Sequence, residues 1–121
     1  MGRGCNEKDW KLFRSKIAGW QEEYMDRLTK EYIELLSSDK EASEKFWELE
    51  KRIKEDKRKT GVIVHMSRSE MSYHLRNLLV EGAICMKDLE DFSDELKDEM
   101  QTYQELWKKY ADDQGKDVDD V

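Results

Sequence analysis

A long run of apolar residues with helical spacing constrains this chain more than any other feature. Between residues 7 and 36, apolar side chains recur every three or four positions, at Trp10, Phe13, Ile17, Trp20, Tyr24, Leu28, Tyr32 and Leu35. This stripe predicts one amphipathic helix of eight turns, about 45 Å long. A helix of that length needs a partner of similar length, because most helical stability comes from packing of the apolar face.

The same spacing predicts three more helices, over residues 40–59, 67–81 and 86–111. Residues 62–66, between the second and third, include the only β-branched run of the chain and fit either a short strand or an extended connector. Glycine is the usual left-handed residue just after a helix, so Gly61 and Gly82 are predicted to end the second and third helices.

Ser38 or Asp39 is predicted to cap the second helix, and capping boxes are predicted at the starts of the third and last helices. Ser67 and Glu70 have the spacing of a capping box at the start of the third helix. Cys85 and Asp88 form an imperfect version of the same motif before the last helix.

Composition supports an all-α fold. The chain has no proline and 42% charged residues, against 37% hydrophobic ones, so its core must be thin. The prediction is an elongated antiparallel helical bundle of about four helices, two of them long. Residues 1–111 form its single domain, and residues 112–121 form a disordered acidic tail. The stripes with Trp10, Trp20 and Trp107 carry more aromatic surface than one thin bundle covers, which predicts a homodimer.

Nothing in the sequence indicates an enzyme. His65 and His74 lack companions at metal-ligand spacing, and Glu70 with His74 makes only one i, i+4 pair. Cys85 has no base positioned by any motif, and no glycine-rich phosphate loop or nucleophile elbow is present. We therefore expect no catalytic residue, no metal site and no cofactor.

The two cysteines, Cys5 and Cys85, cannot form a disulfide framework or a zinc site alone. The first residues contain no apolar stretch of a secretory signal, and no window has the 18 apolar residues that span a bilayer. These features predict a reduced, cytoplasmic protein that does not enter a membrane.

Charge is distributed unevenly along the chain. Residues 1–85 carry 17 Lys and Arg against 16 Asp and Glu, and residues 86–121 carry 5 against 13, which accounts for the net charge of −7. The last helix contains a dense group of carboxylates, which is either a solvated face or a surface that imitates a phosphate backbone. In the second interpretation, the chain is an acidic inhibitor of a nucleic-acid-handling protein such as a nuclease, an anti-CRISPR-like decoy. The predicted partner-binding residues are Asp91, Asp94, Asp98 and Glu99.

An alternative is a DNA-binding regulator. It would use the basic run 51–59 and the helix 67–81, because residues 69–84 resemble the recognition helix of winged-helix repressors. The β-wing expected after that helix is replaced by an acidic helix, and residues 60–64 separate it from the preceding helix. The candidate phosphate-binding residues are Lys51, Lys54, Arg58, Arg68 and Arg76.

Residues 8–14 (KDWKLFR) and 88–96 (DLEDFSDEL) resemble a family of small uncharacterised helical proteins of gut clostridial-type bacteria and their mobile elements. Members are sometimes labelled multidrug transporters, although the chain lacks a membrane span. The resemblance implies no active site, and it favours a role in the nucleic-acid transactions of a mobile element. The sequence thus predicts a non-enzymatic protein-binding module, with a DNA-binding regulator and a structural dimer without ligand as alternatives.

Overall fold

The computed structural model describes the backbone of residues 6–120 and the side chains of residues 6–111. Its elements, in chain order, are α1 (Glu7–Leu36), α2 (Ala42–Asp56), the 3-10 turn η1 (Arg68–Glu70), α3 (Met71–Glu81), the 3-10 turn η2 (Met86–Leu89) and α4 (Asp94–Asp120). The predicted all-α fold is confirmed. Within residues 6–120 no strand is present, so 62–66 is a connector. The backbone of residues 112–120 continues α4, where the sequence predicted a disordered acidic tail (112–121); the side chains of these residues, and residue 121 as a whole, lie outside the described part of the chain.

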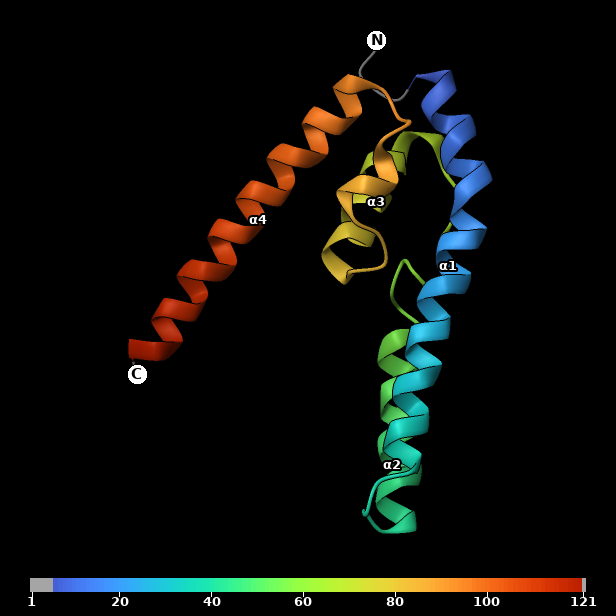
Figure 1. Cartoon of the computed structure of the whole chain (residues 1–121), viewed down its shortest axis with the longest axis vertical. Coiled ribbons are helices and arrows are strands. Elements are labelled where there is room, and N and C mark those ends of the chain that lie inside the picture. The colour runs from blue at the N-terminus through green and yellow to red at the C-terminus, as the bar shows by residue number, and fades with distance from the viewer. Residues whose placement is uncertain (1–5, 121) are drawn as a thin grey trace.

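The other three helices, α2, α3 and α4, are arranged around α1 (Figure 1). α2 runs antiparallel to α1 beside its C-terminal half, and α3 lies beside its N-terminal half. α4 starts near the N-terminus of α1 and leads away from it, so that the two helices form a V with α3 between them. The predicted antiparallel arrangement holds for α1 and α2, whereas α3 and α4 run in the same direction as α1. Segment 57–67 returns the chain toward the N-terminal end of α1 before α3, and segment 82–93 does the same before α4.

The hydrophobic core lies in one half of the molecule. It joins the N-terminal part of α1 to α3, η2 and the first turns of α4, and its fully buried side chains are Phe13, Met71, Leu75, Leu78, Leu89 and Met100. Trp10 and Trp20 belong to this core, so they do not supply the unpaired aromatic surface on which the dimer prediction partly relied. Trp107 remains half exposed.

Only one of the two glycine predictions is confirmed. Gly82 follows α3 with a φ of 80°, as a left-handed glycine should. Gly61 does not have a positive φ and caps no helix, since α2 ends at Asp56. A Cβ at Gly61 would lie 2.4 Å from Cδ2 of the Tyr24 ring, so glycine is needed there for close approach.

The predicted capping box at the start of the third helix is wrong. The Ser67 hydroxyl lies 3.2 Å from the hydroxyl of Ser69, and the Glu70 carboxylate lies 3.6 Å from the His74 ring. The Ser67 side chain makes no capping hydrogen bond, and the 3-10 turn η1 precedes α3. By contrast, the backbone amide of Cys85 donates to the Asp88 carboxylate at 2.8 Å, as the sequence predicted.

The predicted last helix is interrupted at residues 90–93. Ser93 caps α4, because its hydroxyl accepts a hydrogen bond from the Leu96 amide at 3.2 Å. The amide and hydroxyl of Ser93 donate to the two carboxylate oxygens of buried Asp9, at 2.8 and 2.6 Å. Phe92 turns into the core and stacks on Trp20, with ring centroids 6.3 Å apart. These contacts with α1 end the turn η2 and start α4 at Asp94.

Candidate protein-binding surfaces

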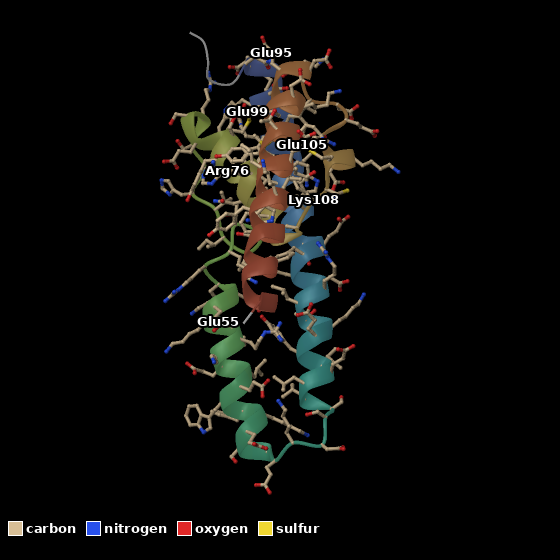
Figure 2. All side chains as sticks on the ribbon, turned by 90° about the vertical axis from the view of Figure 1, so that its left-hand side faces the viewer. Glu55, Arg76, Glu95, Glu99, Glu105 and Lys108 are labelled. Atoms are coloured by element: carbon tan, nitrogen blue, oxygen red, sulfur yellow. The ribbon has the colours of Figure 1, made fainter. Side chains whose placement is uncertain are left out.

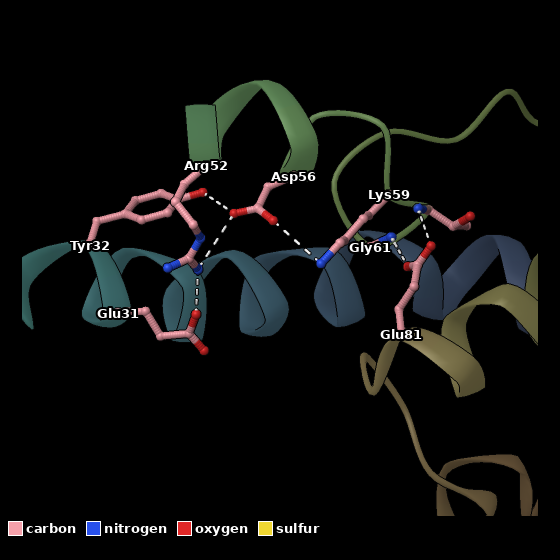
Figure 3. Close-up of polar contacts among 8 residues, drawn as sticks. Glu31, Tyr32, Arg52, Asp56, Lys59, Gly61 and Glu81 are labelled. Atoms are coloured by element: carbon pink, nitrogen blue, oxygen red, sulfur yellow. Dashed lines mark hydrogen bonds and ion pairs between the residues drawn. The ribbon is translucent and has the colours of Figure 1, made fainter. Parts of the chain in front are cut away.

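A polar network around Asp56 joins α2 to α1 (Figure 3). The Tyr32 hydroxyl donates to Oδ2 of Asp56 at 2.5 Å, and Lys59 Nζ lies 3.4 Å from Oδ1. Arg52 lies 3.8 Å from the same carboxylate and forms a 2.6 Å ion pair with Glu31. Asp56 is buried, so its charge needs these partners. The network therefore fixes one rotation of α2 about its own axis.

A second carboxylate anchors the α1–α2 hairpin to α3, through the segment that follows α2. The backbone amides of Thr60 and Gly61 donate to the Glu81 carboxylate, at 2.9 and 3.0 Å (Figure 3). The Thr60 carbonyl accepts a hydrogen bond from the side chain of Gln21 at 3.0 Å. Sequence reasoning missed both carboxylates, because Asp56 and Glu81 lie in charged stretches with no recognisable motif.

The network predicts a shifted titration of Tyr32. Burial, followed by the hydrogen bond to Asp56, raises the pKa of Tyr32 from 10.0 to about 12. An unfolded tyrosine ionises near its ordinary pKa, so the protonated phenol stabilises the fold below pH 10 and this contribution is lost between pH 10 and 12. We expect an ultraviolet phenolate titration to show one tyrosine near 12 that is missing in Tyr32→Phe. A Tyr32 that titrates near 10 would contradict the network.

The network turns the polar side of α2 toward α1. The less exposed residues of α2 recur every three or four positions, at Lys45, Glu48, Leu49, Arg52 and Asp56, and Asp56 is its only buried residue. Ala42, Phe46, Leu49 and Ile53 have the helical spacing of a core stripe, but only Leu49 among them is partly covered, so they do not form one. Because Arg52 and Asp56 pair with α1, the apolar residues of α2 other than Leu49 are left on its exposed surface.

Phe46, Trp47 and Ile53 form what we call the α2 apolar surface. Phe46 and Trp47 are 62% and 63% exposed, and their rings meet edge to face with centroids 4.9 Å apart. Ile53 is seven residues after Phe46, two turns along the same side of the helix, and is also exposed. Glu50, which lies between Phe46 and Ile53 in the helix, forms an ion pair of 3.6 Å with Lys54, the residue after Ile53.

The predicted acidic residues are exposed but do not share one helix face. Asp94, Asp98 and Glu99 lie in the first two turns of α4, whereas Asp91 lies in the connection before it. Asp94 is 97% exposed and lies 3.5 Å from Lys97. The Glu99 carboxylate accepts a hydrogen bond of 3.4 Å from the Ser72 hydroxyl, and Figure 2 places Glu95 and Glu99 at the upper end of α4.

The predicted basic residues lie on separate parts of the fold. Lys51 and Lys54 belong to α2, and Arg58 to the turn after it. Arg68 forms a 2.9 Å ion pair with Glu7 beside the other half of α1. Arg76, on α3, stacks between Tyr73 and Tyr103, with its guanidinium carbon 5.0 and 4.2 Å from the ring centroids. The fold thus separates the basic run 51–59 from the predicted recognition helix (Figure 2).

His74 is a buried structural residue. Its Nε2 lies 3.2 Å from the backbone carbonyl of His65, which ties the connector to α3. In the part of the chain that the structure describes, no three His, Cys, Asp or Glu side chains are placed to hold a metal ion. Cys85 is exposed, and Cys5 lies outside the described residues.

No protein-family model, curated protein sequence or solved structure matches this chain. The resemblance to the family of small helical proteins therefore stays a prediction. Among the described residues, no helix has both the length and the apolar character that crossing a membrane requires.

Proposed function

We propose that this chain is a non-enzymatic protein-binding module that presents the α2 apolar surface to a partner protein. The observation that carries this proposal is the orientation of α2, which packs on α1 through Arg52 and Asp56 and leaves Phe46 and Trp47 in solvent. A helix that served only to complete the core would turn Phe46 and Trp47 toward α1.

The partner that suits this surface is a protein with an apolar groove that accepts one helix. Amphipathic helices are recognised through apolar residues one and two turns apart, as Phe46 and Ile53 are. Glu50 and Lys54, which flank Ile53 on the helix, form an ion pair and neutralise each other, so the surface carries little net charge. Because the Asp56 network holds α2 in place beforehand, binding costs less conformational entropy than ordering a free helix would.

A second candidate function is inhibition of a nucleic-acid-binding protein by the acidic residues. It is favoured by the exposure of Asp91, Asp94 and Asp98, which leaves three carboxylates available to a basic channel. This role agrees with the resemblance to proteins of mobile elements. We propose the cytoplasm as the site of action for either function, because an exposed free thiol such as that of Cys85 suits a reducing compartment.

One capture experiment tests both functions. The full chain, immobilised, is compared with the double variant Phe46→Ser, Trp47→Ser and with the triple variant Asp91→Lys, Asp94→Lys, Asp98→Lys in a lysate of the source organism. We expect a protein retained by the original chain and by the triple variant but lost with the double variant. The affinity of that protein, once purified, should fall by at least tenfold for the double variant, or about 1.4 kcal/mol.

Ile33→Ser is the matched control, because Ile33 is 61% exposed but lies on α1. All of these changes are at exposed positions, so each variant should melt within a few degrees of the original chain. Loss of the captured protein with the triple variant alone would favour the acidic inhibitor instead. Equal capture by all variants would contradict both functions.

A further inference from the structure

The apolar stripe of α4 continues beyond the helix that covers it. Met100 is fully buried against α3, but α3 ends at Glu81, about level with Trp107. From there the stripe is open to solvent: Leu106, Trp107 and Tyr110 are 60%, 48% and 58% exposed. The rings of Trp107 and Tyr110 pack against each other, with their centroids 6.2 Å apart.

An open groove accompanies this exposed stripe. Its walls are formed by residues one turn apart on two helices: Arg76, Asn77 and Val80 of α3, and Tyr103, Leu106 and Trp107 of α4. Val80 and Tyr73, on the same side of α3, are also exposed. Arg76 is the only charged side chain among the lining residues, and it is already stacked between two tyrosine rings.

We propose that the occupant of this groove is α4 of a second copy of the chain, packed antiparallel across a two-fold axis between Leu106 and Trp107. Positions 103, 106, 107 and 110 are symmetric about that axis. Each copy therefore places its Tyr103 opposite Tyr110 of the other copy, and its Leu106 opposite Trp107 of the other copy. A two-fold contact requires a surface that complements itself, and this arrangement of residues does so.

Charge and area both suit a second copy. Residues next to a two-fold axis lie close to the same residues of the other copy, so charges there would repel, but Tyr103, Leu106, Trp107 and Tyr110 are all uncharged. The exposed parts of these side chains and of Tyr73 and Val80 amount to about 500 Å² per copy. The two copies together would bury about 1,000 Å², the lower limit for a specific interface, so the dimer should be weak and dependent on concentration.

This assembly is separate from the proposed function. The groove uses α3 and α4, whereas the α2 apolar surface lies on the α1–α2 hairpin (Figures 1 and 2). A dimer through α4 would therefore leave both α2 surfaces free and make the binding module bivalent. Failure of either proposal leaves the other standing.

The first test measures the mass of the full chain by sedimentation equilibrium, from about 5 to about 500 μM. The mass should rise from 14.5 kDa toward twice that value. Leu106→Glu should remain a monomer throughout, because it places a carboxylate against Trp107 of the other copy, while Ile33→Glu, equally exposed on α1, should dimerise like the original chain. A monomer at every concentration, or a dimer unaffected by Leu106→Glu, would overturn the proposal.

The second test examines the antiparallel register. In a chain with Cys5→Ser and Cys85→Ser, the variants Tyr103→Cys and Tyr110→Cys are oxidised separately and as a mixture at high concentration. A disulfide needs Cα atoms about 4.4–6.8 Å apart, and in this register position 103 faces position 110 of the other copy, whereas neither position faces its own counterpart. Covalent dimers should form mainly in the mixture. Efficient crosslinking of either variant alone, or none in the mixture, would refute the register.

Discussion

Gly61→Ala is expected to destabilise the protein by about 3 kcal/mol and to lower its melting temperature by roughly 10 °C. The added Cβ would lie 2.4, 2.8 and 2.9 Å from three carbons of the Tyr24 ring. Tyr24 is buried, so the ring cannot turn away without disturbing the core. Movement of the backbone instead would break the hydrogen bonds from Thr60 and Gly61 to Glu81, which join the hairpin to α3.

Gly19→Ala is the matched control for this variant. Gly19 lies inside α1, and an added Cβ would meet nothing within 4 Å. Because alanine favours the helix over glycine, this variant should gain up to about 1 kcal/mol. Thermal melts and urea titrations measure both effects. A Gly61→Ala variant as stable as the original chain would mean that residues 60–62 do not pack against Tyr24 as described.

Asp9→Ala is expected to cost about 3 kcal/mol and to loosen the start of α4. The buried Asp9 carboxylate accepts two hydrogen bonds from Ser93, which is 84 residues away in sequence. Its loss leaves a partly buried amide and hydroxyl without their acceptor, and the hydroxyl also caps the amide of Leu96. Hydrogen exchange should then show faster exchange of the first amides of α4.

Asp9→Asn separates charge from hydrogen bonding, because the amide oxygen can still accept from the Ser93 amide. It should cost about 1 kcal/mol. Asp91→Ala, at an exposed position before α4, should change stability by less than about 0.5 kcal/mol. In a double-mutant cycle, Asp9→Ala and Ser93→Ala should be clearly non-additive, and additive effects would contradict the contact.

The sequence predicted the helical content well because apolar spacing is a local property. The stripe from Trp10 to Leu28 is buried in α1 as expected, and the end of α3 at Gly82 follows from a conformation that glycine adopts freely. The cap at Ser93 had a recognisable signal, a serine followed by Asp94 and Glu95 in the first turn of a helix. It was missed because the apolar spacing continues across the break.

The candidate binding surfaces were less accessible to prediction. Phe46 and Ile53 have the spacing of core residues, and nothing within α2 indicates that Arg52 and Asp56 pack against α1 instead. The groove between α3 and α4 combines residues from two helices, such as Val80 and Trp107, whose relative position depends on how the segment 82–93 returns the chain.

The sequence by itself determined that this protein is helical, roughly where its helices lie, and that acidic residues gather near its C-terminal end. Only the tertiary structure decided which side of α2 faces α1 and how the helices are placed relative to one another. The reason is physical: helix formation depends on neighbours three and four residues apart, whereas the orientation of α2 depends on partners for a buried charge, such as Tyr32 for Asp56, 24 residues away. Those partners exist only once the helices have packed, and they leave Phe46 and Trp47 facing solvent.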